Sequence, residues 1–173
     1  MIQTLALESF QLNNAGIVLL NPFLPTLFSR LGLLENGHFF DDNTRIKAVY
    51  LMCYSVHGIV SPPDDNLILL KAFVGIDLSV SLYPVPEIAD NEKETVDIIL
   101  NSMIKHWTRL GNTSIEGLRA SFLQREGKLE EKEEYYVLNV DNKSYDMLLD
   151  SIPWSFSIIR FPWMAKPIRV NWR

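Results

Sequence analysis

The sequence predicts an α+β protein, mostly helical, with a small antiparallel sheet formed by the C-terminal third of the chain. Apolar residues recur at helical spacing up to Gly127, and glycines and prolines stand where short helices begin and end. After Gly127 the pattern changes to short runs rich in β-branched and aromatic residues. The chain has 173 residues, 47% of them hydrophobic, so it can bury about 70% of its unfolded surface without a disulfide or a metal.

Two short helices are predicted first. Asn14 can cap a helix that runs to Leu20, and Pro22 suits the first turn of a second helix over 23–31, because its missing N–H has no helical partner there. Gly32 is a natural stop for that second helix.

A third helix is predicted after the capping residues 41–43, and Gly58 ends it. A turn at 61–65 then leads into a fourth helix over 67–73, which stops at Gly75. The apolar positions of the third helix follow the i, i+3, i+4, i+7 pattern: Ile46, Val49, Tyr50, Cys53 and Val56.

The second half contains the longest predicted helix, over 91–110, with acidic residues in its first turn and Lys105 and Arg109 near its end. Thr113 and Glu116 have the spacing of a capping box for a further helix that ends before Gly127. The long helix carries one continuous apolar stripe: Val96, Ile99, Leu100, Met103, Ile104, Trp107 and Leu110.

Four strands are expected after Gly127. The first two are 128–129 and 136–140, which form a hairpin around an acidic tip at 130–134. A short helix over 145–149 follows, and the last two strands are 157–161 and 168–172.

Charge and proline content divide the chain into two predicted parts. Residues 1–90 hold nine acidic and four basic residues, whereas acidic and basic residues are equal in number over 91–173. The first half therefore carries the whole net charge of −5. Pro84 and Pro86 favour extended backbone between the halves. We therefore expect a helical lobe at 1–82 and a second part at 83–173, containing the helix, the hairpin and the C-terminal strands, packed as one compact unit.

The composition argues against several classes of protein. The most apolar stretch, 15–28, is broken by Asn21, Pro22 and Pro25, so no membrane insertion is expected. The acidic balance disfavours nucleic acid. One cysteine and three histidines cannot form a usual zinc site or a disulfide framework, which fits a reducing compartment.

No catalytic motif or cofactor-binding motif is present, so we expect no enzyme and no cofactor. Cys53 lies on an apolar stripe and is interpreted as a core residue, not a nucleophile. His106 is interpreted as a surface residue and not a metal ligand. Asp146 and Asp150 stand at i, i+4 and are expected to share a solvated helix face.

The last 23 residues combine aromatic and basic side chains, and this pattern leaves three interpretations open. They are stacking on single-stranded nucleic acid, a protein interface anchored by Trp and Arg, or a small sheet with an aromatic inner face and a charged edge. The candidate partner-binding residues are Trp154, Arg160, Trp163, Arg169 and Trp172.

Several segments together resemble the contractile injection system tape measure protein family. The first are NAGIVLL at 14–20 and PFLP at 22–25, and the clearest runs from HW at 106–107 through LGNTS at 110–114 to FLQREG at 122–127. The C-terminal matches are PWS at 153–155, PWM at 162–164, PIRV at 167–170 and Trp172.

The resemblance implies a structural assembly component of a phage-tail-like contractile injection machine, in which family members set the length of the inner tube and are anchored at the baseplate hub. It implies protein partners among hub, tube or spike subunits, and self-association inside the tube. A soluble adaptor or chaperone for a tube or effector protein is the alternative, and the acidic first lobe would then select a basic partner.

The length of the chain differs from what a protein that measures tube length by its own extent would need. Even a fully helical copy of this chain would span only about 260 Å, and prolines, glycines and strands make it much shorter. We therefore expect a globular terminal domain, as a fragment, a separate subunit or a short paralogue. The NAG…PFLP segment occurs once in this chain, and an apolar helical hairpin of this kind needs a neighbour to cover it. We therefore expect it either to expose apolar surface or to close onto the helix at 91–110.

Overall fold

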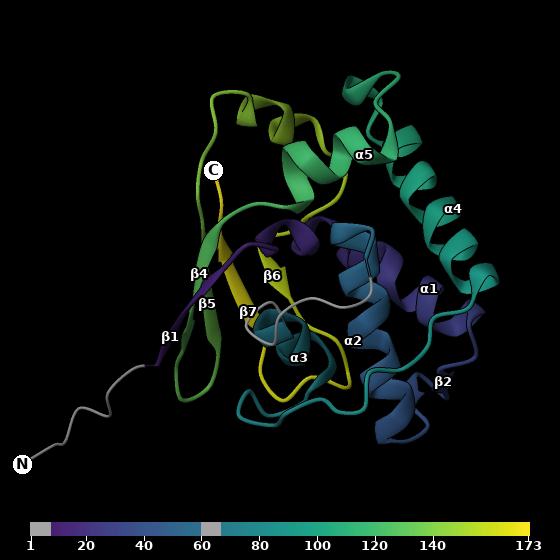
Figure 1. The fold of residues 1–173 in the computed structure, drawn as a ribbon. Helices are drawn as coiled ribbons and strands as arrows, with labels where there is room; N and C mark the ends of the chain where they lie inside the picture. The colour runs from purple at the N-terminus through teal and green to yellow at the C-terminus, as the bar shows by residue number, and fades with distance from the viewer. Residues whose placement is uncertain (1–7, 60–66) are drawn as a thin grey trace, which may run out of the picture.

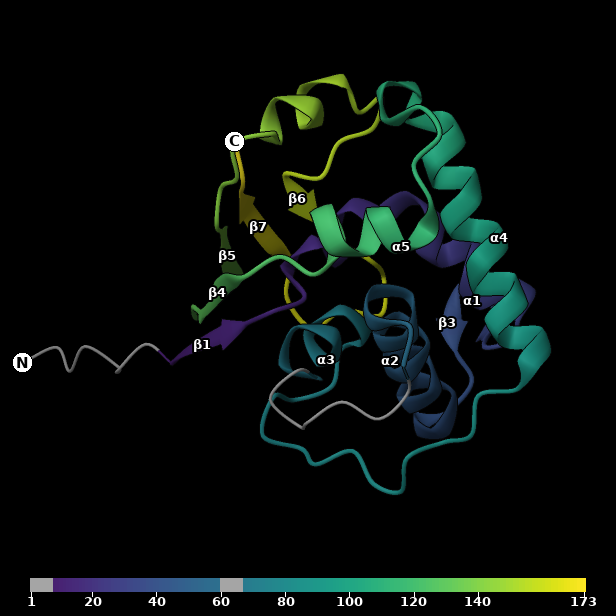
Figure 2. The same cartoon turned by 45° about the horizontal axis from the view of Figure 1, so that its top comes forward.

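A five-stranded sheet lies on one side of the molecule, and the helices pack against one of its faces (Figures 1 and 2). The computed structural model describes residues 8–59 and 67–173. The strand order is β1-β4-β5-β7-β6. The bounds are β1 Ser9–Leu12, β4 Gly127–Glu131, β5 Tyr136–Val140, β6 Ile158–Ile159 and β7 Ile168–Asn171.

The α+β class is confirmed, but the sheet is mixed and not purely antiparallel. Strands β5 and β7 pair in parallel, because the chain crosses between them through η5 (Asp146–Ser151) and β6. Strand β1, which the sequence analysis did not predict, comes from the N-terminal part of the chain and pairs with β4. The sheet therefore joins the two ends of the sequence.

The first predicted helices are present with changed geometry. Helix η1 (Ala15–Phe23) is 3₁₀ and continues directly into α1 (Leu24–Arg30). Asn14 precedes η1 but makes no side-chain capping hydrogen bond. A small hairpin of β2 (Leu34–Glu35) and β3 (His38–Phe39), which was not predicted, follows α1.

The third and fourth predicted helices are present and end at left-handed glycines, whereas the helix predicted over 91–110 ends four residues early. The third and fourth are α2 (Asp42–His57), which ends at Gly58, and α3 (Ile68–Val74), which ends at Gly75. Helix α4 (Asp90–His106) stops before Trp107, and a short η3 (Thr108–Leu110) follows. The turn predicted at 61–65 lies outside the described residues.

The predicted capping box at Thr113 is wrong. The N-cap of α5 (Ile115–Leu118) is Ser114, whose hydroxyl accepts a 3.0 Å hydrogen bond from the Gly117 N–H. The Thr113 hydroxyl instead donates to the Leu110 carbonyl at 2.6 Å. The last turn after α5 is the π-helical η4 (Arg119–Leu123).

The NAG…PFLP segment is closed, not exposed. Residues 15–20 of η1 are all buried, and η1 and α1 contact α4, η4 and α2. Buried residues from both halves of the described chain form one hydrophobic core. The accessible surface of 9273 Å² is close to the ~8,700 Å² expected of a compact monomer of 19.9 kDa. The division at residue 82 stays a prediction.

Candidate interaction site

The three candidate tryptophans fasten the C-terminal segment to the rest of the molecule. Trp163 is 7% exposed, and its indole N–H donates to the Phe73 carbonyl at 2.9 Å. The half-buried Trp154 donates to the Leu19 carbonyl at 2.9 Å. Because these carbonyls belong to the first half, the two indoles join segments that are 90 and 135 residues apart in the sequence.

Trp172 takes part in a buried polar cluster that the sequence analysis did not identify. Its indole N–H donates to Asp146 Oδ2 at 3.0 Å. Arg125, which is fully buried, donates to both carboxylate oxygens of Asp146 at 2.7 and 2.9 Å. The guanidinium also lies over the Trp172 ring, 5.1 Å from its centroid. The cluster therefore ties strand β7 and the adjoining Trp172 to η5 and to Arg125, two residues after η4.

The predicted solvated face of Asp146 and Asp150 is wrong for Asp146, which is 1% exposed. Burial disfavours its ionised form, but hydrogen bonds from Arg125, from the Lys143 N–H and from Trp172 outweigh this, so the pKa of Asp146 lies below its ordinary value. Asp150 does face solvent, where it pairs with Arg173 at 2.9 Å.

The candidate arginines occupy a different environment from the tryptophans. Arg160 and Arg169 are both exposed, and neither lies within 4.0 Å of a carboxylate among the described residues. The Arg169 guanidinium lies 4.1 Å from the centroid of the Tyr135 ring, a cation–π contact. The assignment of all five residues to partner binding stays a prediction, and only the arginines and part of Trp154 are accessible to a partner.

Comparison with known families decides the identity of the chain. The family model of the contractile injection system tape measure protein matches residues 3–172. The chain belongs to this family. The resemblance found in the sequence is thereby confirmed, and the role of the chain is structural, within a contractile injection system and related to its tape measure. No curated protein and no solved structure matches the chain.

The family segment 117–127 organises the centre of this fold. Arg119, 4% exposed, donates to the carbonyls of Ser55 at 3.0 Å and Tyr54 at 3.2 Å. Gln124 donates to the Val56 carbonyl at 3.0 Å. These side chains donate to carbonyls in the last turn of α2, of which that of Tyr54 also accepts from the Gly58 N–H, and a positive charge is favourable at this end of a helix.

Two ionisable side chains near this end of α2 are withdrawn from solvent, Cys53 fully and His57 in part. Burial raises the pKa of the Cys53 thiol to about 12, which confirms it as a core residue. Burial, and then the nearby Arg119 charge, lower the pKa of His57. His106 is exposed, as predicted. The described residues hold no group of three or more His, Cys, Asp or Glu side chains placed to bind a metal.

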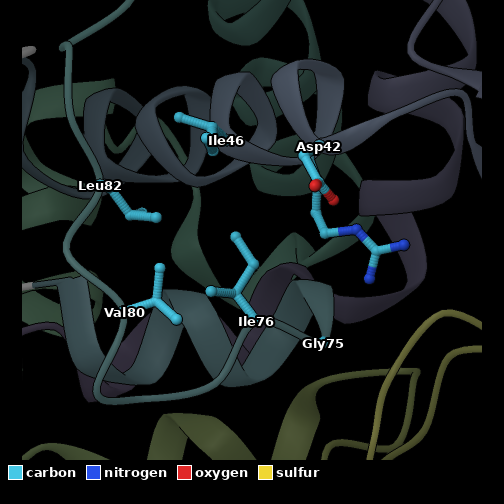
Figure 3. A pocket seen from close by; sticks show the side chains of 7 residues that line it. Asp42, Ile46, Gly75, Ile76, Val80 and Leu82 are labelled. Carbon is cyan, nitrogen blue, oxygen red and sulfur yellow. The ribbon is translucent and has the colours of Figure 1, made fainter.

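A shallow pocket of about 240 Å³ lies between the start of α2 and the segment after α3 (Figure 3). Ile46, Ile76, Val80 and Leu82 form its apolar walls, Asp42 stands at one end, and Arg45 also lines the pocket. The Arg45 guanidinium is held there by the Val74 carbonyl at 2.9 Å. The volume lies below the usual range for small-molecule sites, about 300–1,000 Å³. None of the helices within residues 8–59 and 67–173 combines the length and the hydropathy that a membrane-spanning helix requires.

Proposed function

We propose that this chain acts as a globular docking domain of a contractile injection particle, which binds the baseplate hub or the inner tube and carries out no chemistry. The observation that carries the proposal is its folding around one core. The longest described helix has 17 residues and spans only about 25 Å, so the described residues do not form a measuring rod.

The distribution of contacts supports a rigid docking unit. The sheet pairs β1 with β4, and the indoles of Trp154 and Trp163 reach carbonyls of the first half, so distant parts of the chain hold one another in place. A domain of this kind presents a fixed surface, which lowers the entropy cost of assembly on a subunit of the hub, spike or tube. We place its synthesis and assembly in the cytoplasm, and allow self-association inside the tube.

The test is deletion of the gene in the producing cell, followed by negative-stain microscopy and mass spectrometry of purified particles. We expect the chain at a fixed ratio to the tube subunit in wild-type particles, and few or malformed particles without it. Tubes of unchanged number and uniform length in the deletion strain would contradict the proposal. If assembly fails without the chain but finished wild-type particles lack it, the alternative of an adaptor or chaperone holds.

A further inference from the structure

The outer face of the sheet is open to solvent. Side chains alternate along each strand, so Leu129, Leu138 and Val170 point toward the helices, while Val137 and Arg169 point away from them. In both overall views the described helices lie on one side of the sheet, and none crosses the other side (Figures 1 and 2). The far edge of this open face is strand β6.

The backbone of β6 offers unused hydrogen-bonding groups at that edge. The N–H of Val170, in β7, donates to the carbonyl of Ser157 at 2.8 Å, so these two residues form a hydrogen-bonded pair between the strands. Hydrogen-bonded and non-hydrogen-bonded pairs alternate in an antiparallel ladder. The N–H and C=O groups of Ile158 therefore point away from β7. Arg160 follows the end of the strand, and among the described residues no hydrogen bond to the backbone of Ile158 or Arg160 is formed from elsewhere.

The side chains beside this edge form a patch that fits a protein partner. Ile158 is 61% exposed and lies opposite Arg169, which stacks on Tyr135. Arg160, which is also exposed, follows directly after the last residue of β6. Arginine and tyrosine are the residues that most often anchor interfaces.

The charges of the patch favour an acidic partner. In β4, two strands away from β7, Glu130 and Glu131 are already paired with lysines, Glu130 with Lys128 and Lys132, and Glu131 with Lys166. The two arginines thus remain without a carboxylate among the described residues, in a chain whose net charge is −5. Beside these charges, the two-residue strand β6 presents the exposed apolar side chain of Ile158 to solvent.

We infer that β6 accepts an extended, acidic segment of another particle protein as a sixth strand, held by the free backbone groups of Ile158 and Arg160 and by salt bridges to Arg160 and Arg169. This inference rests on the proposed docking function and specifies its surface. Main-chain bonds would supply the binding and the two guanidinium groups would select for carboxylates.

The first experiment measures incorporation of variants into particles by quantitative mass spectrometry. Ile158→Pro removes the outward N–H but leaves the ladder with β7 intact, a position that proline tolerates in edge strands. We expect at least a tenfold loss of incorporation, with Ile158→Val as the matched control that stays at the wild-type level. Arg160→Glu/Arg169→Glu should cause a similar loss without a change of backbone, whereas Lys105→Glu/Arg109→Glu on the α4 side should not.

Thermal unfolding of each purified variant establishes that it is folded before its incorporation is compared. Wild-type levels of Ile158→Pro and of the double arginine variant in particles would overturn the β6 site while leaving the docking function intact. Absence of the wild-type chain from particles would overturn both.

A second experiment identifies the occupant. With p-benzoylphenylalanine in place of Ile158, ultraviolet irradiation of purified particles should link the chain to an acidic segment of another protein. A link to a second copy of this chain, to a basic segment or to nucleic acid would overturn the inference, as would the absence of any link from a chain that is incorporated.

Discussion

Among single residues, Asp146 has the most demanding environment, because its carboxylate neutralises a guanidinium that has no access to solvent. Both oxygens receive hydrogen bonds from Arg125, at 2.7 and 2.9 Å. Removing one member of such a pair leaves the other charge buried and uncompensated. We expect Asp146→Asn to lower the free energy of unfolding by about 3–5 kcal/mol, measured by urea denaturation followed by circular dichroism.

The matched control for this prediction is Asp150→Asn, four residues further along the same element. Asp150 also pairs with an arginine, but both side chains of that pair face solvent. We expect the urea midpoint of this variant to stay at the wild-type value. Equal losses of unfolding free energy in the two variants would show that the buried pair stabilises the fold no more than the exposed pair does.

His57 predicts a pH dependence of stability. Burial, and then Arg119, lower its pKa in the folded chain, so the unfolded state binds the proton more tightly. Stability should therefore fall as the pH drops through about 6.5 toward the lower, folded value. We expect the urea midpoint of His57→Gln to change less between pH 7.5 and 5.5 than that of the wild type. The variant His106→Gln, at an exposed position, should show the same dependence of the midpoint on pH as the wild type.

At the residue scale, the sequence predicted correctly whether a side chain is buried or exposed where the element has a regular helical period. Cys53 and His106 were placed correctly in the core and on the surface, because both belong to regular α-helices. Asp146 was misplaced because η5 is a 3₁₀ helix. With about 3.0 residues per turn, positions four apart point about 120° away from one another and do not share a face.

Between elements, Gly16 sets the distance of η1 from η4. A Cβ atom built on Gly16 would lie 1.9 Å from the Phe122 carbonyl oxygen and 2.6 Å from Leu123 Cα, both backbone atoms that cannot move aside cheaply. We expect Gly16→Ala to lower the free energy of unfolding by about 3 kcal/mol, measured by urea denaturation.

Gly117→Ala in α5 is the matched control, because a Cβ there would meet only side-chain atoms, at 3.2 and 3.3 Å. Helix propensity favours alanine at such a position, so we expect a change within about 1 kcal/mol in either direction. A wild-type urea midpoint for Gly16→Ala would show that η1 and η4 can separate without cost.

At the element scale, helix ends were predictable where the chain uses local capping. The Asp41 carboxylate accepts from the Thr44 N–H at 2.8 Å, and Gly58 and Gly75 adopt left-handed backbone at the helix ends. Strand β1 was not predictable, because its four residues form a strand only through pairing with β4, more than 100 residues away. The parallel pairing of β5 with β7 was not predictable either, because it depends on how the chain between these strands packs.

The whole molecule predicts a result for scattering in solution. A compact chain of this length has a radius of gyration of about 16 Å. We expect small-angle X-ray scattering of the purified monomer to give a value near this figure and a bell-shaped Kratky plot. A value several times larger, as for a rod, would contradict both the compact fold and the proposed docking function.

The sequence by itself determined the α+β class, the positions of the main helices, the burial of Cys53 and the family. These depend on local periodicity, on capping residues and on motifs that can be recognised one segment at a time. Only the tertiary structure decided that Trp163 and Trp172 belong to the core while Arg160 and Arg169 remain accessible, and that Asp146 is buried against Arg125. Their partners come from distant parts of the chain, and burial depends on which elements pack together, which no local pattern encodes.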